Sequence, residues 1–361
     1  MPVAMRNALT ELLGTRYPII QSPMTWVSDA RLAADVSAAG AFGIFASTTV
    51  AAGEVDAAIA SIKHMTSAPF GVYATGLQPN LEEVVEAVIR HKVRGFCYGR
   101  GVSSATLERL KSHGVVCMTN VGAVRHAVKA VEAGADILLV QGGEAGGHTG
   151  PVATMVLLPQ VLDAVKVPVV AAGGFRDGRG LAAALACGAV GIAMGTRFMM
   201  TTSTRVAPST LAHYARVSDP SKIVVSSAID GLPQRVIVNR MVEQMEQSSA
   251  AKQLLPALRS AWALKTQGKM SFLQFAATSL KALREGPVAA TQTLRMARLP
   301  ELLKLGLEHG DVENGLLPAG QAAAAISNIV SCEEVIHEIA HVAAERLRGI
   351  GHEITVTHDK S

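Results

Sequence analysis

The sequence repeats one pattern eight times: a short, strongly apolar run of strand-forming residues, followed in seven cases by a helical pattern. The runs occupy residues 17–21, 41–47, 69–75, 94–98, 115–120, 135–141, 167–174 and 189–195. Glycines such as Gly40, Gly114, Gly134 and Gly188 stand where a helical pattern ends and the next run begins. A helix that ends on glycine and leads directly into a strand is typical of parallel α/β units.

The apolar runs are nearly continuous rather than alternating, which is typical of strands that are covered on both faces. Eight such units within the first 195 residues favour the α/β class and a (β/α)8 TIM barrel. A doubly wound open sheet is the alternative, because the repeat alone does not show that the sheet closes.

The pattern changes after residue 202. Residues 203–310 read as helices and turns, with one short strand-like run at 222–230. The eighth run still lacks a helix to cover it, and residues 332–347 carry apolar side chains at helical spacing. We therefore predict a barrel in residues 1–202, a helical insertion domain in 203–310, and a segment, 311–361, that returns to the barrel with the eighth helix.

Composition excludes several classes of protein. Hydrophobic residues make up 49% of the chain and charged residues 17%, so a large core can form and general disorder is excluded. The net charge of +4 is spread without long runs of one sign, which gives no support for a nucleic-acid partner. The N-terminus lacks the apolar segment of a signal peptide, and the most apolar stretch, 181–194, is too short to span a bilayer. The four cysteines are far apart and predict neither a disulfide framework nor a zinc knot. We expect a cytoplasmic protein without a membrane partner.

In a TIM barrel, the loops that follow the strands form the reactive face. The loop after the sixth run, residues 141–150, reads QGGEAGGHTG and contains five glycines. Because this much glycine costs backbone entropy, it suggests a ligand held against the main chain. His148 is the single histidine in this loop, and we take it as the candidate acid–base residue.

The loops after the seventh and eighth runs contain Gly173-Gly174 and Gly195-Thr196. These two loops are where such barrels often bind phosphate through backbone N–H groups. Glycine lets the main chain approach the oxygens, and the Thr196 hydroxyl adds a donor. A phosphate site beside a lone histidine, without metal ligands, suggests a phosphorylated organic cofactor.

Three segments of the sequence carry a family resemblance: 141–150, 171–189 and 192–198. Together they resemble the nitronate monooxygenases, formerly called 2-nitropropane dioxygenases, and the FMN-dependent enoyl-acyl carrier protein reductases. Segments 228–236 and 318–321 also resemble flavoenzymes that handle a bicyclic CoA thioester in bacterial degradation of the steroid C and D rings. The resemblance implies an FMN-bearing barrel, with residues 203–310 as the substrate domain.

The resemblance also implies roles for individual residues. His148 matches the catalytic histidine of the family. Tyr73 stands where relatives carry asparagine, and Asn120 stands where some quinone-reducing relatives carry lysine. The positions that match FMN contacts are Ser22, Pro23 and Met24 at the isoalloxazine, Gln141 at the flavin or ribityl, Gly146 in the glycine-rich loop, Gly173, Gly174, Gly195 and Thr196 at the phosphate, and Gly320 and Gln321 in a late loop that folds back on the flavin.

Three functions remain open at this point. The first is oxidation of a nitronate or nitroalkane by O2, with His148 removing a proton or binding the nitro oxygens. The second is NAD(P)H-linked redox chemistry of a CoA or acyl-carrier thioester, with basic residues of the insertion either holding the CoA or simply solvated. Those residues are Arg235, Arg240, Lys252 and Arg259. The third is a flavin-binding sensor without turnover. The sequence leaves open the small-molecule substrate, the redox partner and the oligomeric state, including a homodimer.

One further motif, HEIAH at residues 337–341, matches the HExxH pattern of zinc proteases. A third ligand at the usual spacing is absent, since Leu347 stands where a histidine would be required. Because this helix is also predicted to cover the eighth strand, we interpret the motif as structural and expect no metal.

Overall fold

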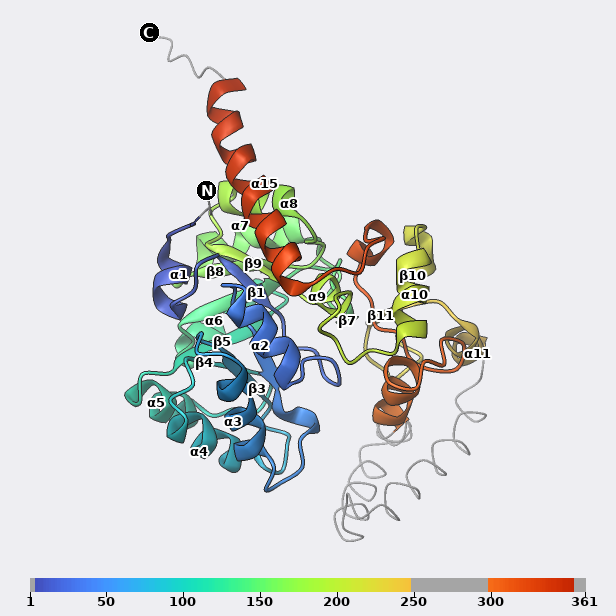
Figure 1. The fold of residues 1–361 in the computed structure, drawn as a ribbon, viewed down its shortest axis with the longest axis horizontal. Coiled ribbons are helices and arrows are strands. Elements are labelled where there is room, and N and C mark those ends of the chain that lie inside the picture. Colours follow the sequence, from blue (N-terminus) through green and yellow to red (C-terminus); the bar gives the residue numbers. More distant parts are fainter. Residues whose placement is uncertain (1–3, 248–297, 354–361) are drawn as a thin grey trace.

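The computed structural model describes residues 4–247 and 298–353 (Figure 1). Eight parallel strands form one sheet in the order β1-β9-β8-β6-β5-β4-β3-β2. The strands are β1 (Ile19–Gln21), β2 (Ile44–Ala46), β3 (Gly71–Ala74), β4 (Gly95–Tyr98), β5 (Val116–Val121), β6 (Ile137–Gln141), β8 (Val169–Ala172) and β9 (Gly191–Met194). The two ends of this sheet meet, because Phe42 N–H donates to the Ile19 carbonyl and Gln21 N–H to the Phe42 carbonyl, each at 2.9 Å. The predicted (β/α)8 barrel is confirmed, and each strand overlaps its predicted run.

Helices follow the barrel strands and surround the sheet. They are α2 (Ala30–Ala38), α3 (Val55–Met65), α4 (Leu81–Arg90), α5 (Ser104–Ser112), α6 (Val124–Glu132), α7 (Thr154–Ala164) and α8 (Gly178–Ala186), with a 3-10 turn, η1 (Ser47–Thr49), before α3. Their ends follow local chemistry: the Asp29 carboxylate accepts from the N–H of Leu32 and begins α2. Gly188 has a φ of 98° between α8 and β9, a conformation that favours glycine.

Apolar side chains fill the barrel and seal one of its ends. Ile20, Ile44 and Leu139 belong to a buried cluster inside the sheet. Leu9 and Leu13 of α1 (Ala8–Leu13) join this cluster. Because α1 precedes the first strand and packs where the strands begin, the mouth available to ligands is at their carboxyl ends.

The eighth helix comes late in the sequence. Helix α15 (Cys332–Glu353) packs against α8 and α2, which is the place of the helix that should follow β9 (Figure 1). A β-carbon at Gly178 would lie 2.5 Å from the carbonyl oxygen of Ile339, so α8 and α15 approach closely at this glycine. None of the helices in residues 4–247 and 298–353 combines the length and hydrophobicity that a membrane-spanning segment requires.

The segment between β9 and α15 lies beside the barrel in Figure 1. It contains α9 (Thr196–Met199), α10 (Pro208–Arg216), η2 (Pro220–Lys222), α11 (Arg240–Gln247), helical residues 298–307 and η3 (Gln321–Ala325). Residues 248–297, the middle of the predicted helical insertion, lie outside the described residues. The boundaries at 202 and 310 stay predictions.

This segment also contains two strands, of which the first lies within the strand-like run predicted at 222–230 and the second was not predicted. Strand β10 (Ile223–Ser226) pairs with β11 (Gln234–Ile237), and β11 pairs antiparallel with β7 (Gly147–His148) of the glycine-rich loop. Only residues 222–230 had been interpreted as strand-like. Strands this short carry too few residues for a clear periodicity, and β7 exists only because β11 lies next to it.

Candidate active site

A cavity of about 340 Å3 opens at the carboxyl ends of the barrel strands, a size typical of small-molecule sites. The loops after β1, β6, β8 and β9 contribute to its walls, as do residues 318–322 and the helical residues 298–307. Ten of the residues singled out from the sequence line it together: Ser22, Pro23, Met24, Gln141, Gly146, His148, Gly173, Gly174, Gly195 and Thr196.

Gln321 does not line this cavity. Its backbone N–H donates to the carbonyl of Glu144 at 2.9 Å, and the residue lines a neighbouring cavity beside Arg235. Gly320 and Ala322 face the main cavity instead. The late segment therefore returns to the mouth of the barrel, but Gly320 and Ala322 rather than Gln321 line the main cavity there. A cofactor contact of this segment stays a prediction.

Two of the loop glycines are required by the protein itself. A β-carbon at Gly142 would lie 2.1 Å from Thr154 Oγ1, and one at Gly146 would lie 2.5 Å from the backbone nitrogen of Gly320. The carboxylate of Glu144 accepts from both the backbone N–H and the hydroxyl of Thr154, at 2.9 and 2.8 Å. At these two positions glycine allows tight folding of the loop against α7 and residue 320. Gly146 also lines the cavity, so its predicted cofactor contact stays a prediction.

His148 pairs with an aspartate that the sequence analysis missed. The Nε2 of His148 lies 2.8 Å from Oδ2 of Asp230, whose side chain is fully buried, while half of the His148 side chain is exposed. Burial opposes ionisation of Asp230, but hydrogen bonds from His148 and from the N–H of Leu232 outweigh it, so the pKa of this carboxyl is below its usual value. Asp230 is thus a carboxylate at neutral pH.

This pairing determines which nitrogen of His148 is reactive. A carboxylate can only accept hydrogen bonds, so the Nε2 of His148 must carry the proton that points at Asp230. In the neutral ring, Nδ1 then has a free lone pair, and no hydrogen bond within residues 4–247 and 298–353 engages it. The arrangement can therefore accept a proton at Nδ1 and stabilise the resulting imidazolium through Asp230.

Asp230 lies 82 residues from His148 in the sequence, and the pairing of β7 with β11 brings the two together. One signal was present: Asp230-Gly231 is a dipeptide typical of tight turns between strands, and apolar residues flank it. It indicated a hairpin but gave no indication that the hairpin would reach the glycine-rich loop.

The two positions at which the sequence departs from relatives have different surroundings. Asn120 lines the cavity and donates from Nδ2 to Oε1 of Gln141 at 3.2 Å, and Gln141 in turn donates to the carbonyl of His148 at 2.8 Å. Tyr73 packs against the apolar cluster inside the barrel and is not among the residues lining the cavity. Burial raises the pKa of Tyr73 to about 12.

The loops after β8 and β9, which contain Gly173-Gly174 and Gly195-Thr196 and are called the phosphate loops after their predicted role, have donors without partners. Gly173 and Gly174 have φ values of 97° and 82°. In the part of the chain that the structure describes, the backbone N–H groups of Gly174, Gly195 and Thr196 donate no hydrogen bond. The Thr196 Oγ1 accepts from the Gly320 N–H at 3.0 Å, which leaves its own proton to donate. Unpaired donors gathered at a cavity fit the phosphoryl group of a bound cofactor.

One wall of the cavity is apolar. Leu299, Leu303 and Leu307 are spaced four residues apart on the helical residues 298–307, and all three line the cavity. Side chains at this spacing lie on one face of a helix. The site therefore combines a polar end, with His148, and a continuous aliphatic surface.

The two described basic residues of the insertion, Arg235 and Arg240, have different surroundings. Arg235 donates to the carbonyl of Gly143 at 2.7 Å, which ties β11 to the glycine-rich loop. Arg240 donates to an asparagine side chain at 2.6 Å. Lys252 and Arg259 lie outside the described residues. Arg235 is thus engaged within the protein, whereas a role of the exposed Arg240 toward CoA stays a prediction.

The two histidines of the HExxH segment lie on α15 and have different partners. The ring of His337 contacts the edge of Tyr17, and His341 lies 3.2 Å from Glu345. Among the described residues, no three side chains of the metal-binding types gather at one point.

Comparison with known proteins gives a consistent family assignment. Residues 6–97 and 81–341 match the profile of the family described as "Nitronate monooxygenase". The chain is 41% identical, over 95% of its length and 98% of the relative, to the (3aS,4S,5R,7aS)-5-hydroxy-7a-methyl-1-oxo-octahydro-1H-indene-4-carboxyl-CoA dehydrogenase of Mycobacterium tuberculosis. It is 32% identical to a probable nitronate monooxygenase of Staphylococcus haemolyticus, over 67% of this chain and 80% of the relative.

Solved structures agree with these matches. FabK from Thermotoga maritima aligns with a TM-score of 0.79 and 28% identity, over 97% of this chain and 100% of that one. A nitroalkane oxidase from Streptomyces ansochromogenes shares the fold, with a TM-score of 0.75 at 24% identity, over 95% of this chain and 100% of that one. The chain therefore belongs to the nitronate monooxygenase family, a family of flavin-dependent oxidoreductases.

Proposed function

We propose that this protein is an FMN-dependent dehydrogenase or reductase that acts on the CoA thioester of an apolar, alicyclic acid. The observation that carries the proposal is that the His148–Asp230 pair and the leucine wall line or border one cavity. A small nitroalkane needs no such wall, whereas a ring system buries apolar surface against it. The 41% identical relative, matched over nearly its whole length, is named for a substrate of this kind.

The residues at the mouth of the barrel fit FMN as the flavin. The unpaired N–H groups of Gly174, Gly195 and Thr196 would hold its phosphate. Met24 and its neighbours in the loop after β1 would border the flavin ring. Gln141, whose amide already donates to the His148 carbonyl, would form further hydrogen bonds to the flavin. When bound, FMN would exchange two electrons, as a hydride equivalent, with the substrate.

The protein's own contribution is proton transfer and orientation. Dehydrogenation removes a proton and a hydride equivalent from the substrate, and Nδ1 of His148 would take the proton. Asp230 would hold the ring in the reactive tautomer and stabilise the imidazolium. Leu299, Leu303 and Leu307 would exclude water and orient the apolar part of the substrate.

A second candidate is oxidation of a nitronate or nitroalkane by O2. It is supported by the family profile and by relatives such as the probable nitronate monooxygenase of Staphylococcus haemolyticus. In that reaction His148 would remove the acidic proton beside the nitro group, and the same Asp230 contact would assist.

Anaerobic mixing separates the two candidates. The purified holoenzyme is mixed separately with NADH, NADPH, a nitronate and an alicyclic CoA thioester, and the visible flavin absorption is followed. Bleaching by a pyridine nucleotide, or by a hydroxylated thioester, supports the thioester oxidoreductase. Bleaching by the nitronate alone supports the monooxygenase and contradicts the first proposal. Mass analysis of the released flavin checks that it is FMN.

A further inference from the structure

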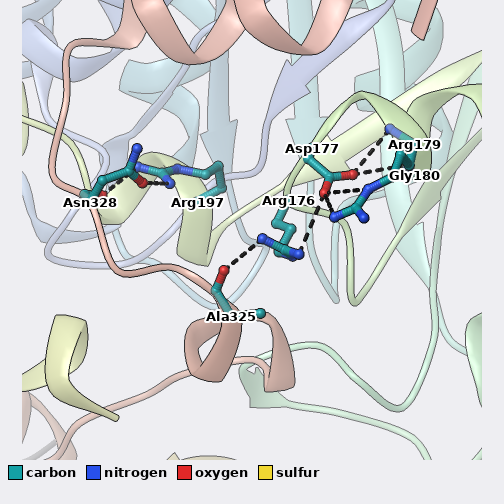
Figure 2. Close-up of polar contacts among 7 residues, drawn as sticks. All are labelled: Arg176, Asp177, Arg179, Gly180, Arg197, Ala325 and Asn328. Atoms are coloured by element: carbon teal, nitrogen blue, oxygen red, sulfur yellow. Dashed lines mark hydrogen bonds and ion pairs between the residues drawn. The ribbon is translucent and has the colours of Figure 1, made fainter. Parts of the chain in front are cut away.

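A second cavity, of about 320 Å3, is lined by residues of the segments that follow β8 and β9. Figure 2 shows the polar contacts of its arginines. Three arginines line it: Arg176, Arg179 and Arg197. The first and third directly follow residues that line the main cavity, since Phe175 and Thr196 face the active site. The two cavities are thus back to back, separated by the loops after β8 and β9.

Arg197 is a buried cation without an anion in contact. Only 5% of its surface is exposed, and its guanidinium donates to neutral oxygens alone: Asn328 Oδ1 at 2.9 Å, the Asn328 carbonyl at 3.0 Å and the Met200 carbonyl at 2.8 Å. Within the described residues, its Nε has no hydrogen-bond partner and it forms no ion pair, although the charge of Glu338 acts on it at longer range. Burial lowers the pKa of Arg197. A buried charge of this kind is costly unless a counter-ion joins it.

The other two arginines share one carboxylate. Arg179 donates from Nε to Oδ2 of Asp177 at 3.0 Å, and Nη2 of Arg176 lies 3.6 Å from the same oxygen. Nη1 of Arg176 donates to the carbonyl of Ala325 at 2.7 Å, a contact visible in Figure 2. With Glu338 as the other acidic residue of the lining, three positive charges face two negative ones. The cavity therefore carries a net positive charge.

One short segment separates this cavity from the active site. Gly320 and Ala322 line the main cavity, whereas Ala325 and Ile326 line the arginine cavity. The side chain of Arg176 holds this segment in place through Ala325. A ligand with its reacting group beside His148 and a flexible arm across the segment would place an anionic tail among the arginines.

We propose that the arginine cavity binds a phosphoryl group of an adenine nucleotide, and that this group belongs to the nucleotide end of the CoA thioester. Guanidinium groups match phosphate oxygens in geometry and charge. The inference rests on the proposed thioester function for the choice of nucleotide. A pyridine dinucleotide offers the same chemistry, so the experiment must distinguish the two sources.

The test compares two arginine variants with a matched control. Arg179→Ala removes one positive charge from the cavity, and Arg179→Glu replaces it with a negative one. The control, Arg90→Gln, removes an exposed arginine that also pairs with a single aspartate, Asp56. Arg90 is the last residue of α4 and therefore lies at the end of the barrel opposite the active site. Steady-state kinetics use an alicyclic CoA thioester and the corresponding N-acetylcysteamine thioester, which lacks the nucleotide.

The expected result is a rise in KM for the CoA thioester of about tenfold or more in each cavity variant, with a similar kcat. The KM for the truncated thioester should stay the same, and Arg90→Gln should match wild type with both substrates. Equal effects on both thioesters, or no effect on either, would overturn the inference while leaving the thioester function intact. Loss of bound FMN in the variants would also overturn it, by assigning these arginines to the flavin phosphate.

Direct binding separates failure of the inference from failure of the proposed function. Calorimetry of the holoenzyme with free coenzyme A needs no turnover, and wild type should bind it about tenfold or more tightly than Arg179→Ala. If the binding of NADPH, rather than of coenzyme A, weakens in the variants, the phosphoryl site stands and its source is the dinucleotide. If wild type binds neither nucleotide, the site is not a nucleotide site.

Discussion

Replacing Asp230 by asparagine should disable His148 by reversing its tautomer. The two carboxylate oxygens have different partners: Oδ1 accepts from the N–H of Leu232 at 3.0 Å, and Oδ2 accepts from Nε2 of His148 at 2.8 Å. A backbone N–H can only donate, so the single oxygen of the asparagine must stay at Leu232. The NH2 group then faces His148, and Nε2 has to accept. The ring proton moves to Nδ1, which loses the lone pair that removes the substrate proton.

The expected loss follows from the value of a general base. Positioned acid–base groups contribute about 10²–10⁴-fold, or roughly 3–5 kcal/mol of barrier. Asp230→Asn should therefore lower kcat by about this factor with a substrate that must lose a proton, and His148→Ala should do the same. Asp230→Ala imposes no tautomer, because it removes both polar atoms, so it should retain more activity than asparagine. With a pre-ionised substrate such as a nitronate, Asp230→Asn should recover much of its rate.

The assay is steady-state turnover of the flavin-loaded variants, with melting temperature and flavin content as controls for folding. The reasoning fails if Asp230→Asn, with flavin bound, keeps kcat within about threefold of wild type on the proton-requiring substrate. It also fails if Asp230→Ala has a clearly lower kcat than Asp230→Asn while both variants melt at normal temperatures. The Asp230 contact would then act only by holding the His148 ring in position, not by setting its tautomer.

Three further outcomes are expected. Gly174→Val and Gly195→Val should yield folded but colourless protein. Valine strains the positive φ of Gly174, and at both positions its methyl groups fill the space in front of the unpaired N–H groups. A yellow Gly195→Val protein with full flavin content would contradict the phosphate site. His341→Ala should leave activity near wild type, and metal analysis should find no stoichiometric zinc, since this side chain is exposed and its ion pair within the described residues is with Glu345. Activity lost on chelation and restored by zinc would show otherwise. Thiol titration at about pH 8 should find Cys187 alone reactive in the native protein and four reactive thiols after denaturation. Burial raises the pKa of Cys117 to about 12 and raises those of Cys97 and Cys332, so these three thiols stay protonated. A second fast-reacting thiol in the native protein would contradict this burial.

The barrel could be predicted because its strands have a local signature. Both faces of β6 and β8 are covered, so almost every residue is apolar and the runs stand out without a long periodicity. The loop residues followed from the fold, since the carboxyl ends of barrel strands form the reactive face. His148, Gly174 and Thr196 were found in this way, and they line one cavity.

What could not be predicted depends on contacts between distant segments. Strand β7 contains two residues and is defined only by its partner β11, so neither the strand nor the Asp230 contact has a local signal. Gln321 bonds through its backbone N–H to Glu144, on another loop, and lines a different cavity. Gly142 and Gly146 suggested a ligand, but the close neighbours that require glycine there are Thr154 and Gly320.

The antiparallel bond between β7 and β11 joins two parts of the molecule with separate tasks. The phosphate loops and the loop after β1 belong to the barrel, whereas Asp230 comes from the hairpin outside it. Transient opening of that hairpin would leave the flavin bound but would break the contact between His148 and Asp230. Loss of activity on warming should therefore precede loss of the yellow colour. Substitutions in the hairpin can likewise change proton transfer by His148 without changing the barrel loops that would hold the flavin.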